Sequence, residues 1–128
     1  MSQFTSQWYQ DRLMRQRPAQ IEPADAAEHE VGRFGLQRQI MQYCDAQWPK
    51  WKYTNARACE KSTLEPGHPD FIIYLPQGKF VMIECKAKGG KMSEDQRNWA
   101  AQVAQNQHTV HVCYSLQEFL EIVAKVVQ

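Results

Sequence analysis

The chain of 128 residues lacks several features that identify whole classes of protein. Its formal net charge is only +1, whereas a protein that passively coats DNA is usually more basic. It has no apolar run long enough to cross a membrane, and its first residues lack the hydrophobic stretch of a signal peptide. We therefore expect a cytoplasmic protein, with no membrane partner and with one modest core that folds unaided.

The spacing of the cysteines does not suggest a metal centre. No C-x-x-C pair occurs among the four cysteines, which are Cys44, Cys59, Cys85 and Cys113. Each lies in an apolar or strand-like segment, which favours reduced core residues in a reducing compartment. His108 and His111 lie at or near the ends of a late strand, but no third and fourth ligand follow at a suitable spacing. A structural zinc site is therefore rejected.

The most informative stretch contains two apolar segments joined by a turn. Residues 71–75 are rich in β-branched and aromatic side chains, Pro76-Gln77-Gly78 interrupts them, and residues 79–87 resume the pattern. This pattern predicts a β-hairpin. A three-residue loop would place Leu75 opposite Lys79 and fix the pairing of every residue farther from the turn.

Three charged residues interrupt this hairpin at one end. Counting outward from the loop, Asp70 lies opposite Glu84, and Lys86 shares their face because side chains alternate along a strand. Opposed carboxylates repel each other, and a bound Mg²⁺ would remove that cost. Simpler interpretations are a strand-entry role for Asp70 and a solvated Glu84–Lys86 ion pair. The apolar neighbours of Glu84 argue against a solvated pair, because a buried carboxylate needs a partner.

The same residues resemble the PD-(D/E)XK nuclease signature, because Glu84-Cys85-Lys86 begins fourteen residues after Asp70 of Pro69-Asp70. A wider resemblance, covering roughly residues 30–114, is to the VRR-NUC family. That family includes the nuclease domain of the Fanconi-associated nuclease and small stand-alone phage and bacterial enzymes. The segments that carry the resemblance are residues 66–71, 83–86, 89–96 and 110–114.

The order of expected elements is helix, strand, hairpin, helix, strand, helix. It predicts an α/β fold with a central mixed sheet flanked by helices on both faces. This prediction agrees with the restriction-endonuclease-like core that the resemblance implies. We assign residues 1–29 to an N-terminal arm and linker and residues 30–128 to the nuclease domain. The expected elements are a helix over 30–48, a strand over 51–60, the hairpin, a helix over 94–106, a strand over 109–114 and a helix from 116.

Two of the expected helices have capping-box sequences, formed by Ser93 with Gln96 and by Ser115 with Glu118. On the first helix, a stripe at spacings of four and three predicts the buried face. Its members are Glu30, Phe34, Gln37, Met41, Cys44 and Trp48. Two of them, Glu30 and Gln37, are polar residues on a stripe that should be buried.

The resemblance implies a site that holds Mg²⁺ or Mn²⁺. Asp70 and Glu84 would be ligands, together with the backbone carbonyl of Cys85. Lys86 would orient the attacking water or hold the phosphate. The metal would activate that water and stabilise the charge on the phosphate.

Two further site residues are implied by the resemblance, and each has an open alternative. The family has an acidic residue on its first helix, for which Glu30 is the best match and Glu28 the alternative. Glu30 could instead only complement the positive end of that helix. The family also has a glutamine near the site, matched by Gln96, which could equally serve only as a cap.

The implied activity is that of a divalent-metal-dependent endodeoxyribonuclease, and branched DNA such as a four-way (Holliday) junction is the implied substrate. A catalytically silent DNA-binding or assembly module and a nuclease acting on linear duplex or flap DNA are the alternatives. Because resolving a junction requires two symmetric cuts, we expect a homodimer. The candidate phosphate contacts are Lys52, Arg57, Lys61, Lys88 and Lys91.

Overall fold

The computed structural model describes residues 30, 35–56 and 64–128. Its helices are α2 (Leu36–Asp45), α3 (Glu94–Ala104) and α4 (Leu116–Val126), with a short 3-10 turn at Pro76–Gly78. Its strands are β1 (Tyr53–Asn55), β2 (Phe71–Tyr74), β3 (Phe80–Cys85) and β4 (Val110–Cys113). Within these ranges, no helix combines the length and the apolar character needed to cross a membrane.

The strands form one mixed sheet in the order β1-β2-β3-β4. β1 pairs antiparallel with β2, and β2 pairs antiparallel with β3, as short connections allow. β4 pairs parallel with β3, and this arrangement requires a crossover, which α3 supplies. The predicted α/β fold with a central mixed sheet is confirmed.

The register of the β2–β3 hairpin is the one that the sequence predicts. Phe71 pairs with Ile83 and Tyr74 pairs with Phe80, and the Leu75 N–H donates to the Lys79 carbonyl oxygen over 2.8 Å. The turn closes because Gln77 adopts a left-handed backbone conformation with φ of 67°. The loop therefore has three residues, and its parity decides which side chains share a face.

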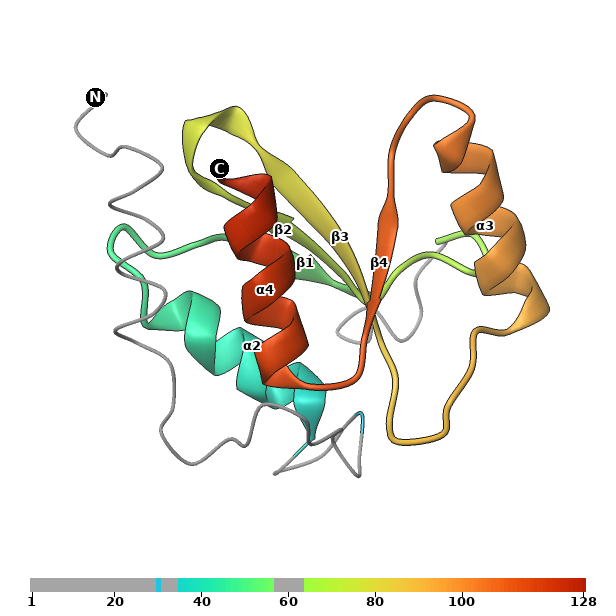
Figure 1. Cartoon of the computed structure of the whole chain (residues 1–128), viewed down its shortest axis with the longest axis horizontal. Helices are drawn as coiled ribbons and strands as arrows, with labels where there is room; N and C mark the ends of the chain where they lie inside the picture. Colours follow the sequence, from blue (N-terminus) through green and yellow to red (C-terminus); the bar gives the residue numbers. More distant parts are fainter. Residues whose placement is uncertain (1–29, 31–34, 57–63) are drawn as a thin grey trace.

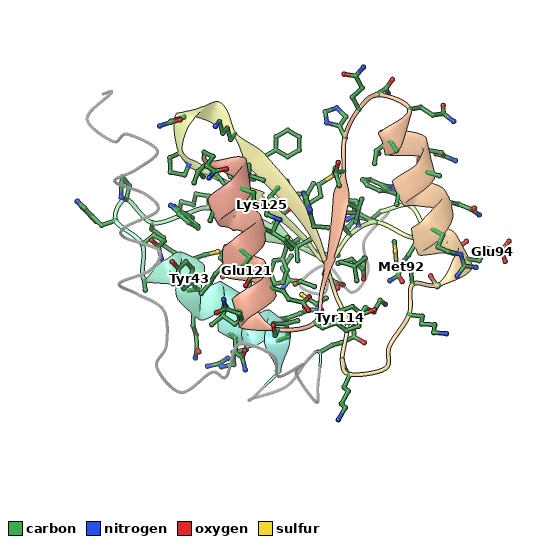
Figure 2. All side chains as sticks on the ribbon, in the orientation of Figure 1. Tyr43, Met92, Glu94, Tyr114, Glu121 and Lys125 are labelled. Carbon is green, nitrogen blue, oxygen red and sulfur yellow. The ribbon has the colours of Figure 1, made fainter. Side chains whose placement is uncertain are left out.

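One face of the sheet is sealed by α2 and α4, which lie together on one side of the strands (Figure 1). The inward-facing side chains of the hairpin join this core, which contains Phe71, Ile73, Leu75, Val81, Ile83 and Cys85. Between the helices, Tyr43 of α2 meets Phe119 of α4 edge to face, with ring centroids 6.1 Å apart. Figure 2 labels Tyr43 on α2 and Glu121 and Lys125 on α4. This core supplies most of the apolar burial that stabilises the fold.

The other face of the sheet is covered by α3 only in part. Figure 1 shows α3 beside β4, on the side of the sheet away from α2 and α4. Toward the hairpin turn, Tyr74 is 50% exposed and Phe80 is 42% exposed. Helices thus flank both faces as predicted, but one face stays open near the turn.

The bounds of two expected elements are wrong. The first helix begins only at Leu36, after the N-cap Gly35, and ends at Asp45. It does not reach Trp48, because Pro49 restricts the residue before it and cannot continue a helix. Trp48 is consequently 74% exposed and does not belong to the buried stripe. Near residue 51, only Tyr53–Asn55 pair as a strand, and residues 57–60 of the expected strand lie outside the described residues.

The last helix shows half of its expected capping box. The Ser115 hydroxyl accepts a hydrogen bond from the Glu118 backbone N–H over 3.1 Å, as predicted. The Glu118 carboxylate, however, accepts from the backbone N–H of Tyr114 over 3.0 Å, whereas a full box requires the N–H of Ser115. The carboxylate therefore holds the end of β4 against the start of α4.

Candidate active site

The two carboxylates that the sequence places opposite each other lie at the end of the β2–β3 hairpin. Asp70 directly precedes β2, and continuing the observed register pairs it with Glu84 of β3. The Asp70 carboxylate accepts a hydrogen bond from the Cys85 backbone N–H over 2.8 Å. On its other side, the Asp70 carbonyl oxygen accepts from the Ala56 N–H over 3.0 Å. Asp70 is therefore held at the junction of three strands.

Glu84 is almost completely buried, with 1% of its surface exposed. Its Oε1 accepts a hydrogen bond from the Gln96 side-chain Nε2 over 2.9 Å, and the Lys86 Nζ lies 3.7 Å from the same oxygen. Its Oε2 is also buried, and no hydrogen-bond partner reaches it among the described residues. A buried acceptor without a partner costs free energy, so this oxygen is available to a ligand.

Burial raises the pKa of Glu84 from its ordinary value of 4.5 to about 8. The negative charge of Asp70 acts in the same direction, and Glu30 adds a smaller effect. The ammonium group of Lys86 opposes them by favouring the ionised carboxylate. In the absence of a cation, the Glu84 carboxyl group thus retains a proton at neutral pH.

Gln96 performs both of the roles that the sequence left open. Its Oε1 accepts from the Ser93 backbone N–H over 2.8 Å, and its own backbone N–H donates to the Ser93 hydroxyl over 3.2 Å. These two bonds complete the predicted capping box. Its Nε2 remains free of the cap and donates to Glu84. The cap therefore aims the amide donor at the carboxylate.

Glu30 lies near this pair, although it is not part of α2. Its charge contributes to the raised pKa of Glu84, and its carbonyl oxygen accepts from the Gln37 backbone N–H over 2.9 Å. The structure thus places Glu30 close enough to Glu84 for its charge to act there. Glu28, the alternative acidic residue, lies outside the described residues.

The candidate phosphate contacts are separated in space. Lys52 is exposed directly before β1, while Lys88 and Lys91 are exposed in the turn that follows β3. The Tyr114 hydroxyl donates to the Gly90 carbonyl oxygen over 2.9 Å and so fastens this turn to the end of β4; Figure 2 labels Tyr114 there. Arg57 and Lys61 lie outside the described residues.

Gly67 is a supporting residue that the sequence did not reveal. Its φ is +92°, a region that favours glycine. A Cβ at this position would overlap the Asp95 carbonyl oxygen and lie 3.0 Å from the Gln96 backbone nitrogen. The loop before Asp70 therefore packs directly on the first turn of α3. His68 of the same loop also contacts Trp99 of α3, with ring centroids 5.4 Å apart.

The donor set fits a hard cation that keeps part of its water shell. Two carboxylates face each other, and the Oε2 atom of Glu84 has no partner in the described structure. Within the same residues, no group of three or more His, Cys, Asp or Glu side chains could enclose a metal. Mg²⁺ and Mn²⁺ prefer oxygen ligands, and Mg²⁺ commonly binds through one or two carboxylates together with water.

The cysteines that the structure describes lie in the core. Cys44, Cys85 and Cys113 are buried and free, which confirms the prediction of core residues for these three. Cys59 lies outside the described residues. Cys85 contributes its backbone to the site, because its N–H donates to Asp70.

Comparison with known families finds one match. The family model described as the VRR-NUC domain matches residues 5–117. The match begins well before residue 30, so it includes most of the segment that we assigned to an N-terminal arm, and the boundary at residue 30 stays a prediction. A comparison with curated proteins and one with solved structures each returned no significant match.

Glu84→Gln is expected to stabilise the metal-free protein at alkaline pH. The folded-state pKa of Glu84, about 8, exceeds its ordinary value of 4.5. Between these two pKa values the folded state holds a proton that the unfolded state has lost, so the stability of the wild type falls as pH rises through this range. Above this range, the unfolding free energy of Glu84→Gln should exceed that of the wild type by roughly 1–4 kcal/mol. Urea unfolding in EDTA at about pH 5 and pH 9 measures the difference.

The matched control for that experiment is Glu65→Gln, because Glu65 is exposed. Its unfolding free energy should stay within about 0.5 kcal/mol of the wild type at both pH values. If the unfolding free energy of Glu84→Gln depended on pH in the same way as that of the wild type, burial would not raise the pKa of Glu84 in the folded protein.

Gly67→Ala is expected to displace the first turn of α3 from the hairpin, because the added Cβ would overlap the Asp95 carbonyl oxygen. The free energy of unfolding should fall by about 1–3 kcal/mol relative to the wild type, because the positive φ and the clash both destabilise the folded state. Urea unfolding measures this loss. Gly78→Ala is the matched control, since Gly78 also has a positive φ but has open space around its Cβ position. Equal losses in the two variants would mean that backbone strain alone, and not the contact with α3, sets the cost.

Proposed function

The chain belongs to the VRR-NUC family, and from this membership we propose that it is a divalent-metal-dependent endodeoxyribonuclease that hydrolyses phosphodiester bonds. Family membership supports a nuclease. The observation that carries the metal-dependent mechanism is the buried Oε2 of Glu84, which lacks a hydrogen-bond partner in the described structure and belongs to a carboxylate set opposite Asp70. We place the reaction in a reducing cytoplasm, with which the free buried cysteines agree.

Asp70 and Glu84 would hold Mg²⁺ or Mn²⁺, with the Cys85 carbonyl oxygen as a further ligand. Such a metal lowers the pKa of a bound water and stabilises negative charge on the phosphate. The contact from the Cys85 N–H to Asp70 supports this geometry, because it fixes one carboxylate oxygen and directs the other. The relief of repulsion between the two carboxylates favours binding of the cation.

Lys86 would orient the attacking water or hold the scissile phosphate. It is 8% exposed, and its Nζ lies 3.7 Å from Glu84, so its charge is directed into the site. Gln96 would hold the Glu84 carboxylate in one orientation through its 2.9 Å hydrogen bond. Glu30 would add negative charge near Glu84.

Binding of DNA would depend on basic residues around this centre. Lys88 and Lys91 lie in the turn that Tyr114 fastens, close in sequence to Lys86. We propose that they contact phosphates, together with Lys52, Arg57 and Lys61. Such contacts position the DNA without reading its sequence.

A catalytically silent DNA-binding or assembly module on the same fold is the alternative from another class. The presence of both Asp70 and Glu84 argues against it. Burying two opposed carboxylates destabilises the folded protein, and a silent module has no use for a cation between them. A nuclease acting on linear duplex or flap DNA would use the same site, and only its substrates would differ.

The first test of this function compares DNA cleavage by the wild type, Glu84→Ala and Lys86→Ala with Mg²⁺. Each variant should lose at least about 100-fold in rate, because each removed group acts on the reacting phosphate or its metal. DNA binding should persist, since it is spread over many basic residues. EDTA should stop the wild type.

Lys125→Ala is the matched control, because Lys125 lies on α4, on the sheet face away from α3 (Figure 2). Its cleavage rate should equal that of the wild type. Robust cleavage in EDTA, or by Glu84→Ala, contradicts the assignment of a metal-dependent site.

We further propose that the substrate is branched DNA, such as a four-way junction, and that the protein acts as a homodimer. Each chain offers one set of Asp70, Glu84 and Lys86, whereas resolving a junction needs two cuts placed symmetrically about the branch point. A two-fold dimer presents two identical sites in a fixed relation.

Mixed dimers of wild type and Glu84→Ala should leave four-way junctions nicked on one strand, because only one subunit of each dimer can cut. Gel analysis of four-way, flap, splayed and linear DNA would identify the preferred substrate, and light scattering at micromolar concentration would give the mass. A monomer with full junction-resolving activity, or paired incisions by mixed dimers, would rule out the division of sites between subunits.

A further inference from the structure

A row of aromatic and basic residues crosses the open face of the sheet near the hairpin turn. Tyr74 pairs with Phe80, and the Tyr74 N–H donates to the Lys52 carbonyl oxygen over 2.9 Å. Continuing the β1–β2 register places Lys52 beside Tyr74, and continuing the β3–β4 register places His108 beside Phe80. We call Lys52, Tyr74, Phe80 and His108 the aromatic row.

The side chains of the aromatic row are exposed although its strands are well packed on their other face. Tyr74 and Phe80 are the exposed aromatic residues of the described sheet, and Lys52 and His108 are exposed as well. The Phe80 and His108 rings have centroids 5.8 Å apart. A protein in water gains nothing from displaying two neighbouring aromatic rings between two basic side chains, which suggests that a ligand covers them.

The aromatic row lies on the same face of the sheet as the candidate active site. Side chains alternate along a strand, so Phe80, Met82 and Glu84 of β3 all project to one side. At roughly 3.3 Å per residue, Phe80 lies about 13 Å from Glu84 along β3. Met82 between them is buried, with 5% of its surface exposed, so a DNA strand whose phosphate reaches Glu84 would bridge this covered stretch, a span of a few nucleotides, before its bases meet the aromatic row.

We propose that the aromatic row binds a single-stranded DNA segment beside the point of cleavage, an inference that rests on the proposed nuclease function. Unpaired bases stack on Tyr74 and Phe80, since every base offers a flat face to an aromatic ring. Lys52 contacts a phosphate of the same segment. The substrate class is thus DNA that is unpaired next to the cut, as at a branch point or flap.

A second copy of this chain is a less suitable occupant. A stable protein interface covers about 800 Å² on each partner and has an apolar centre, whereas two rings flanked by Lys52 and His108 offer a narrow strip. A second copy seated there would also obstruct the face along which DNA reaches Glu84. Single-stranded DNA meets neither difficulty.

The test measures binding of the full chain in EDTA, so that no cleavage intervenes. Fluorescence anisotropy compares a labelled oligo(dT) of about 12 nucleotides with a labelled duplex of about 12 base pairs. Combined Tyr74→Leu and Phe80→Leu keeps the apolar character but removes the stacking surface. Affinity for oligo(dT) should fall about 10- to 100-fold, and affinity for the duplex by less than about threefold.

Trp48→Leu is the matched control, because Trp48 is 74% exposed and lies after α2, outside the strands of the sheet. It should leave both affinities unchanged. A second variant, Lys52→Gln, should lower the slope of log affinity against log salt by about 0.7 for oligo(dT). This variant keeps the inference testable if the double variant fails to fold.

Three outcomes would overturn the inference: unchanged oligo(dT) binding in the folded double variant, equal losses on oligo(dT) and duplex, or a wild-type dimer that the double variant cannot form. The last would make the aromatic row an interface between copies. Failure of the nuclease function itself would look different. The wild type would then bind oligo(dT) through the aromatic row in EDTA and cleave nothing when Mg²⁺ is added.

Discussion

The opposition of two carboxylates across the β2–β3 hairpin constrains the rest of the site. A loop of three residues sets the register, and one residue more or fewer would send Asp70 and Glu84 to opposite faces. Once they are opposed, the fold must hold a buried Glu84 whose pKa rises to about 8. The neighbouring contacts from Gln96 and Lys86 go to one of its oxygens. The other oxygen remains available, which a purely structural arrangement would avoid.

Gln96 connects the local folding of α3 to the geometry of this site. One amide supplies an acceptor to the Ser93 N–H and a donor to Glu84, so the same side chain begins the helix and orients the carboxylate. Gly67 brings the loop before Asp70 against that helix turn. The segments that carry Asp70, Glu84 and Gln96 are therefore packed together, and a shift of α3 changes the site even though α3 adds little to the main core.

The hairpin, its register and the mixed sheet could be predicted because alternation and loop length are local properties of the sequence. The end of α2 was harder, because Trp48 continues an apolar spacing that Pro49 interrupts. The two interpretations of Gln96 could not be separated, since an amide satisfies both at once. The contact between Gly67 and Asp95 joins segments far apart in the sequence, and no local pattern reports such a contact.

The two faces of the sheet have different roles: one packs the hydrophobic core, and the other carries the candidate active site. The face packed on α2 and α4 carries the continuous apolar core, which offsets the cost of burying charged groups on the opposite face. That opposite face holds Glu84 and Lys86 under α3 and leaves Tyr74 and Phe80 open near the turn. Because β3 supplies residues to both faces at alternate positions, the strand that anchors the core also fixes the spacing between the carboxylates and the aromatic row. A ligand that spans this face would therefore meet both at a distance set by the backbone of one well-packed strand.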